Sequence, residues 1–234
     1  MTAAPLVLLA GHVTLDRHGA GFVPGGAATY CALAYAGLGA RVRVVSAAGP
    51  EFPAGALGEV EVALAPAPRT TTFENVYGAG GLRSQRVLAA APPLDPARVP
   101  AAWREADLLH LAPILAEVDL AAFRGAVRAR FTGLGVQGWV RRLAPDGSVA
   151  QPRWDPAPEA LAGVDAAVLG EDDVPGQGDL VGRLARHVPV VAFTHGRRGC
   201  DVIARGRTWR VGIHPAREAD PTGAGDVFSA GFFL

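Results

Sequence analysis

The chain has 234 residues, half of them hydrophobic, so it can bury a sizeable core as one large domain or two small ones. Its 22 basic and 22 acidic residues balance, so no long-range field attracts nucleic acid or an anionic membrane, and a small-molecule partner is expected. No lysine occurs, which excludes the P-loop, protein-kinase and Schiff-base classes, because each of them needs a lysine.

Cysteines and histidines show no pattern typical of a disulfide framework or a zinc site. Cys31 and Cys200 are far apart without Cys-x-x-Cys spacing, so we expect buried free thiols. The six histidines include no His-x-x-x-His pair, which disfavours a protein-built metal cage. The N-terminal apolar run is too short for a signal peptide or a membrane span, so a soluble cytoplasmic protein is expected.

Short apolar runs that end in turns alternate with Ala-rich stretches along the chain. The alternation predicts an α/β fold with a doubly wound, largely parallel sheet flanked by helices, in which ligands bind at the carboxyl ends of the strands. The runs predict strands over residues 6–13, 41–49, 106–113, 132–139, 165–171 and 188–196. Helical spacing predicts helices over residues 26–39, 120–131 and 179–188.

The segment 70–89 departs from this alternation and predicts an antiparallel β-hairpin around "GAGG". Polar residues alternate with apolar ones in it, as on a flap with one face toward a ligand. An ordinary edge hairpin with a solvated face explains the same pattern equally well. A second small excursion is predicted at the turn signal "PDG", residues 145–147.

The ending "TGAGD" followed by "VFSAGFF" places small residues directly before a helix. Gly223, Ala224 and Gly225 can therefore present backbone N–H groups to an anion at the helix N-terminus. A carboxylate beside a bound phosphate is a poor binding group but a good base, so Asp226 is expected to accept the proton of a substrate hydroxyl. On local grounds a tight turn and a favourable interaction of Asp226 with the helix dipole remain an equal alternative.

The stretch "DPTGAGDVFSAGF", residues 220–232, resembles the C-terminal signature of the ribokinase-like carbohydrate kinases, the PfkB family. The resemblance implies that residues 223–225 form the anion hole and that Asp226 is the catalytic base. It also implies that Thr222 contacts the nucleotide and that Asp220 helps to hold a monovalent cation such as K⁺.

Upstream stretches follow in the order that this family requires. By resemblance, "GHVTLD" makes Asp16 the acid that binds substrate hydroxyls, and Gly25 and Gly26 of "PGGAATY" let a sugar approach the backbone. Tyr30 stands where the family usually has Asn. In this respect the sequence most resembles the inositol-kinase-like and nucleoside-kinase-like members. The short gap between Asp16 and Gly25 makes the hairpin 70–89 the better lid candidate. Further candidates for substrate or phosphate contacts, equally plausible as ordinary surface residues, are Asn75, Arg83, Gln85 and Gln137.

The donor side of the resemblance departs further from the family pattern. "LGEDD" occupies the place of the magnesium motif, with Asp173 in place of a longer Glu, and a Mg²⁺-bound water would bridge the missing methylene. "THGRRG" matches the segment beside the nucleotide, which assigns Thr194, Gly196 and Gly199 to cofactor binding.

The sequence thus predicts one ribokinase-like domain over residues 1–234, an ATP- and Mg²⁺-dependent kinase for a hydroxyl of a small neutral sugar, polyol or nucleoside. Only eight residues follow Asp226 where the family continues, so the domain is expected to be incomplete at its C-terminus. A non-catalytic, ligand-binding remnant of the same fold is therefore the alternative, and a homodimer remains open. A Rossmann dehydrogenase is disfavoured because no Gly-x-Gly-x-x-Gly turn follows the first strand.

Overall fold

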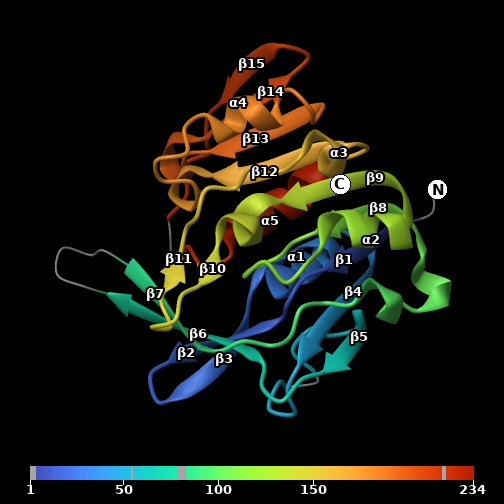
Figure 1. The fold of residues 1–234 in the computed structure, drawn as a ribbon, viewed down its shortest axis with the longest axis vertical. Coiled ribbons are helices and arrows are strands. Elements are labelled where there is room, and N and C mark those ends of the chain that lie inside the picture. Colours follow the sequence, from blue (N-terminus) through green and yellow to red (C-terminus); the bar gives the residue numbers. More distant parts are fainter. Residues whose placement is uncertain (1–3, 54, 78–82, 218–219) are drawn as a thin grey trace.

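A nine-stranded sheet runs through the molecule in the order β15-β14-β13-β12-β9-β8-β1-β4-β5 (Figure 1). The computed structural model describes residues 4–53, 55–77, 83–217 and 220–234. The seven adjacent strands β13-β12-β9-β8-β1-β4-β5 pair in parallel. At the other edge of this sheet, β14 pairs antiparallel with β13 and β15 pairs antiparallel with β14. The strands are β1 (Leu6–Ala10), β4 (Arg41–Ala48), β5 (Glu61–Pro66), β8 (Glu105–Leu111), β9 (Arg128–Gly135), β12 (Ala166–Gly170), β13 (Val190–Thr194), β14 (Cys200–Ala204) and β15 (Arg207–Val211).

Strand composition follows position in the sheet. The central β1, "LVLLA", is a continuous apolar run and is buried from Val7 onward, as a parallel strand covered on both faces must be. The edge strand β15, "RTWRV", is exposed along its whole length and carries two arginines. These charges on an edge oppose pairing with another chain.

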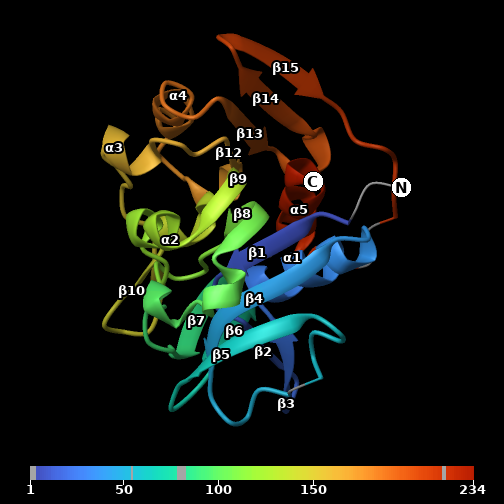
Figure 2. The ribbon, with the colours of Figure 1, turned by 90° about the vertical axis from the view of Figure 1, so that its right-hand side faces the viewer.

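Helices cover both faces of the sheet, so the core has two halves (Figure 2). α1 (Ala27–Gly37) and α5 (Ala224–Phe233) pack together on one face, where Tyr35, Ala230 and Phe233 are buried. The opposite face is covered by the short helices α2 (Leu120–Ala126), α3 (Pro158–Leu161) and α4 (Leu180–Leu184).

A separate four-stranded sheet, β3-β2-β6-β7, projects from one end of the large sheet; we call it the small sheet (Figure 1). β6 (Thr71–Tyr77) and β7 (Arg83–Ala89) form the antiparallel hairpin predicted for residues 70–89. β2 (Thr14–His18) and β3 (Gly21–Gly25) form a second hairpin. The predicted turn at "PDG" is also present, between β10 (Arg142–Leu143) and β11 (Val149–Ala150).

The second hairpin corrects the predicted strand over residues 6–13, which ends at Ala10. The chain then crosses from the large sheet into the small one, so Asp16 lies on β2 and not at the end of β1. A two-residue loop, Gly19–Ala20, joins β2 to β3, and the φ of +58° at Gly19 suits the tight turn that such a loop needs.

Two predicted elements also differ at their boundaries. The helix predicted over residues 120–131 ends at Ala126 because Gly125 and β-branched Val127 are poor helix formers, and the chain continues into β9 at Arg128. The strand predicted over residues 132–139 ends at Gly135 and gives way to a 3₁₀ helix, Val136–Val140.

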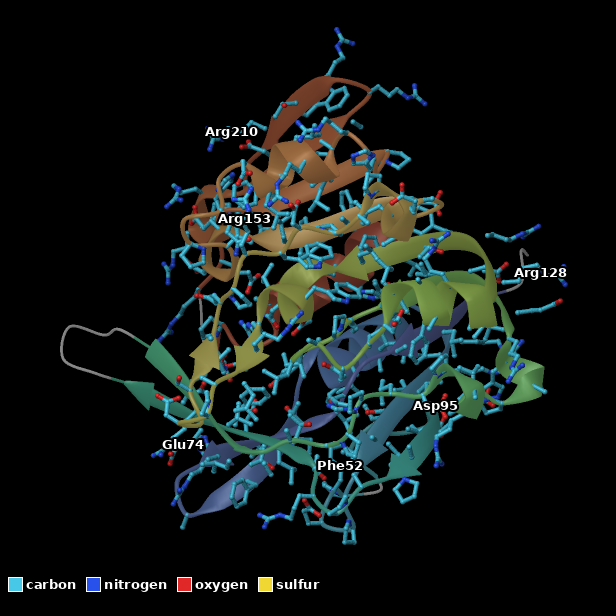
Figure 3. All side chains as sticks on the ribbon, viewed as in Figure 1. Phe52, Glu74, Asp95, Arg128, Arg153 and Arg210 are labelled. Atoms are coloured by element: carbon cyan, nitrogen blue, oxygen red, sulfur yellow. The ribbon has the colours of Figure 1, made fainter. Side chains whose placement is uncertain are left out.

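Several surface and core properties agree with the composition. Cys31 and Cys200 are buried free thiols, as predicted. Charged side chains are dispersed: Glu74 on the small sheet, Arg128 on β9 and Arg210 on β15 lie at three different edges of the molecule (Figure 3). In the part of the chain that the structure describes, no helix combines the length and the apolar character needed to cross a bilayer.

Candidate active site

A cavity of about 220 Å³ lies where β9, β12 and β13 end and where the small sheet meets α1 and α5. It therefore occupies the carboxyl edge of the parallel strands, where ligands bind in such sheets. Most residues predicted from the sequence line it: Asp16, Gly26, Tyr30, Gln85, Gln137, Asp173, Thr194, Thr222, Gly223, Ala224, Gly225 and Asp226.

The floor of the cavity is the N-terminus of α5. Gly223 precedes the helix with a φ of +76°, and a Cβ at this position would lie 2.4 Å from the Tyr30 ring. Only glycine meets both conditions without strain. Cys31 on α1 donates to the backbone oxygen of Asp226 at 3.3 Å, which holds the first turn of α5 against α1. Gly223, Ala224 and Gly225 border the cavity at this turn, and the Ala224 N–H donates to the Pro221 carbonyl oxygen at 3.1 Å. A helix N-terminus at a cavity favours a bound anion.

Asp226 occupies the first turn of α5, where it is half-buried and borders the cavity. Burial raises the pKa of its carboxyl group to about 7. The carboxylate of Asp173 raises this pKa further, whereas the guanidinium of Arg141 lowers it. A carboxyl group with a pKa near neutrality suits proton transfer from a weakly acidic hydroxyl.

Asp173 is fixed by three donors on the wall beside Asp226. Its Oδ1 accepts from Gln137 Nε2 at 3.0 Å and from Arg141 Nη2 at 3.3 Å, and its Oδ2 accepts from the Gly170 N–H at 3.1 Å. A single held carboxylate that borders the cavity suits a Mg²⁺ ion bound through water, because Mg²⁺ retains several waters and takes its other ligands from substrate phosphates. The donor set therefore fits the predicted ion.

Asp16 and its neighbours form the other end of the cavity. Its carboxylate lies over Gly25, where a Cβ would come within 2.4 Å of Oδ2, and Thr14 donates to Oδ1 at 3.4 Å. Gly26 has a φ of +86° and leaves room for no side chain beside Thr14. The glycine pair thus lets β2 and the start of α1 lie close together, with Asp16 and Gly26 both bordering the cavity.

Residues of β6 and β7 close this end. Gln85 borders the cavity and donates to Asn75 Oδ1 at 3.2 Å across the hairpin, while Phe73 adds an apolar surface. Asn75 therefore lies behind Gln85. The side chain of Arg83 lies outside what the structure describes, as do the residues of the hairpin tip, 78–82.

Four other predicted residues, Gly25, Gly196, Gly199 and Asp220, do not border the cavity. Gly196 and Gly199 belong to the turn between β13 and β14, where a Cβ at Gly199 would lie 2.1 Å from the Val211 carbonyl oxygen, so the tight contact with β15 requires this glycine. Asp220 is exposed, and its Oδ1 accepts from the Thr222 N–H at 2.9 Å. Its assignment to a cation remains a prediction.

Sequence reasoning missed three polar residues that border the cavity: Thr14, Arg141 and Ser229, whose hydroxyl donates to the Gly225 carbonyl oxygen at 2.9 Å. Thr14 lies two residues before Asp16, so it shares the same face of a strand, a signal that a strand at residues 14–18 would have provided. Arg141 lies four residues after Gln137, beyond the predicted strand over residues 132–139, and the tertiary fold brings it to Asp173.

Comparison with solved structures identifies the fold as ribokinase-like, as predicted. A pyrophosphate-dependent kinase in the ribokinase family, solved with a pyrophosphate analogue and myo-inositol, is 22% identical, with 97% of this chain and 85% of that chain covered and a TM-score of 0.76. Ribokinase from Thermotoga maritima is 15% identical (97% and 84% covered, TM-score 0.68). A nucleoside kinase from Methanocaldococcus jannaschii is 16% identical (98% and 84% covered, TM-score 0.70). No family model and no curated protein matches the chain.

Proposed function

We propose that the protein is a kinase that transfers a phosphoryl group to a hydroxyl of a small neutral polyol, sugar or nucleoside. The observation that carries the proposal is the convergence of Asp226, the amides at the N-terminus of α5 and Asp16 on one cavity. The convergence supports a base and an anion site next to a carboxylate suited to binding hydroxyl groups. The sugar, polyol and nucleoside kinases that share the fold support the acceptor class.

In the proposed reaction, Asp16 and the backbone at Gly26 orient the acceptor. Asp226 accepts the hydroxyl proton as the acceptor oxygen forms a bond to the phosphorus atom, and the bond from phosphorus to the bridging oxygen of the donor breaks. The amides of residues 223–225 stabilise the charge on the transferred group. Asp173 would hold Mg²⁺ through water, and the bound ion would supply positive charge to the phosphates. The small sheet would exclude water and so limit hydrolysis of the donor.

The donor has two candidates. ATP is the donor that the sequence motifs imply, and Thr194 and Thr222 border the cavity on the side assigned to it. Inorganic pyrophosphate is the second, favoured by the pyrophosphate-dependent kinase of the same fold. Parallel assays with each donor, Mg²⁺ and a panel of polyols, sugars and nucleosides decide between them.

The test of the proposed function is Asp226→Asn. Because this change removes the base and keeps the side-chain shape, turnover is expected to fall at least about 10³-fold while calorimetry shows unchanged acceptor binding. The matched control is Asp155→Asn, because Asp155 pairs with Arg183 away from the cavity. This variant should turn over at the wild-type rate. Acceptor binding by the wild-type protein with no binding of either donor would instead favour the non-catalytic alternative.

A further inference from the structure

Arg141 is the one basic side chain among the described residues that border the cavity, and three carboxylates border it too, those of Asp16, Asp173 and Asp226. Its side chain is only 12% exposed, at the end of the 3₁₀ helix Val136–Val140. The chain has no lysine, so among the described residues that border the cavity this guanidinium is the side chain that can bring positive charge to a phosphate.

The contact between Arg141 and Asp173 is suited to exchange. The Nη2 to Oδ1 distance is 3.3 Å, longer than the strong charge-assisted pairs at about 2.7–2.9 Å. Asp173 also accepts from Gln137 and from the Gly170 N–H, at 3.0 and 3.1 Å. Asp173 therefore remains fixed if Arg141 turns toward another anion, so the exchange strands no buried carboxylate.

Arg141 borders the part of the cavity where phosphoryl transfer would occur. Its charge acts on Asp226, whose pKa it lowers, and Asp226 belongs to the same helical turn as the anion-binding amides. A phosphoryl group bound at these amides and attacked by an oxygen at Asp226 would lie within reach of the guanidinium. The planar fork of arginine matches two phosphoryl oxygens.

We propose that Arg141 is a catalytic residue that binds the transferred phosphoryl group, exchanging its hydrogen bond to Asp173 for bonds to the phosphoryl oxygens. The proposal rests on the phosphotransferase function proposed above. It adds a positively charged side chain of this protein that stays bound to the phosphoryl group while the group moves from the donor to the acceptor. Arginines that stabilise phosphoryl transfer in this way contribute about 10³-fold or more to turnover.

The first test measures binding of inorganic pyrophosphate by calorimetry in EDTA, so that no metal contributes. Arg141→Gln should weaken binding about 10- to 100-fold. The matched control is Arg142→Gln, because it removes the same charge from a side chain whose contacts among the described residues are backbone oxygens of Trp139 and Arg141. This control should bind pyrophosphate as the wild type does. Equal binding by Arg141→Gln, equal weakening by Arg142→Gln, or no binding by the wild type overturns the proposal.

A double-mutant cycle tests the exchange itself. In EDTA, Asp173→Asn should tighten pyrophosphate binding, because Arg141 no longer has a competing carboxylate, and this gain should vanish in the Arg141→Gln background. A gain of the same size in both backgrounds would show a general charge effect and would contradict the exchange. If Arg141→Gln does not fold, Arg141→Lys replaces it, with an intermediate loss expected because the charge remains and the fork is lost.

Turnover separates this proposal from the proposed function. Arg141→Ala should lower kcat about 10³-fold with little change in the acceptor KM, and added guanidinium ion should restore part of the rate, which a merely structural role would not allow. Loss without rescue counts against Arg141. If the wild type turns over no acceptor with either donor, the proposed function is wrong, and the pyrophosphate titrations still decide whether Arg141 binds phosphate groups.

Discussion

The end of the cavity that we propose for the acceptor and the end that we propose for the donor differ in the groups that form them. The acceptor end uses side chains of the small sheet, Asp16 and Gln85, which are held by local contacts at the periphery of the molecule. The donor end uses backbone amides at the start of α5, a helix whose Ala230 and Phe233 belong to the core. The acceptor end can therefore change with little effect on stability, whereas changes at the donor end should alter phosphate binding and folding together.

Gly223→Ala is expected to give the largest effect of this kind. The change places a Cβ on a backbone with a φ of +76° and 2.4 Å from the Tyr30 ring, so α5 or α1 must shift. The expected loss of unfolding free energy is about 2–4 kcal/mol, together with loss of pyrophosphate and ATP binding. Thermal unfolding and calorimetry measure the two effects.

The matched control in the same helix is Gly231→Ala, which meets no atom within 4 Å on an ordinary helical backbone. It should leave donor binding unchanged and stabilise the protein by about 0.5–1 kcal/mol through helix propensity. A stable Gly223→Ala variant that binds phosphate normally would contradict the coupling of fold and anion site at the donor end.

Asp16→Asn tests the acceptor end and should have a smaller effect. Loss of a charged hydrogen-bond acceptor for substrate hydroxyls should raise the acceptor KM about 10- to 100-fold, with the donor KM and the unfolding temperature unchanged. Thr14→Val, which removes only the hydroxyl that donates to Asp16, should raise it less. An equal rise in the donor KM would show that the two ends are not separate.

The residues at the start of α5 could be predicted to lie together for a physical reason. In residues 220–226 the small residues, the turn and the start of the helix are contiguous in the sequence. A candidate anion site and base could therefore be predicted there without knowledge of the fold. Likewise, the alternation of apolar runs and helical spacing predicted most of the large sheet. The β2–β3 hairpin was missed because the run over residues 6–13 continues its apolar character past the crossing at Ala10.

Contacts distant in the chain were beyond prediction. The Arg141 to Asp173 pair joins residues 32 positions apart, and it depends on the 3₁₀ helix after β9, where periodicity predicted strand. The motif assigned Gly196 and Gly199 to nucleotide binding, which stays a prediction; the structure places both in the β13–β14 turn. In the structure, glycine is required at position 199 because a Cβ there would clash with the Val211 carbonyl oxygen. The motif alone did not indicate this packing requirement.

The pH dependence of turnover tests the electrostatics that link the two ends. Because burial raises the pKa of Asp226 to about 7, kcat/KM should rise with pH as the carboxylate forms and should level off above neutrality. Asp173→Asn should move this midpoint to lower pH, since a carboxylate that raises the pKa is removed. Arg141→Gln should move it to higher pH. Profiles measured from about pH 5 to 9 that leave both midpoints in place would contradict the assignment of Asp226 as the base.

The same pKa gives a stability signature that requires no activity. In the unfolded chain the Asp226 carboxyl group ionises near pH 4, but in the folded protein it ionises near 7, so between these values the folded state holds the extra proton. Stability must then fall as pH rises through this window and stay constant above it. Asp226→Asn should remove this fall and stabilise the protein above pH 7 by on the order of 2 kcal/mol. Urea unfolding of the wild type and of Asp226→Asn at acidic and alkaline pH measures this difference in stability. If the free energy of unfolding changes with pH equally in both proteins, the pKa of Asp226 is not raised and its assignment as the base is contradicted.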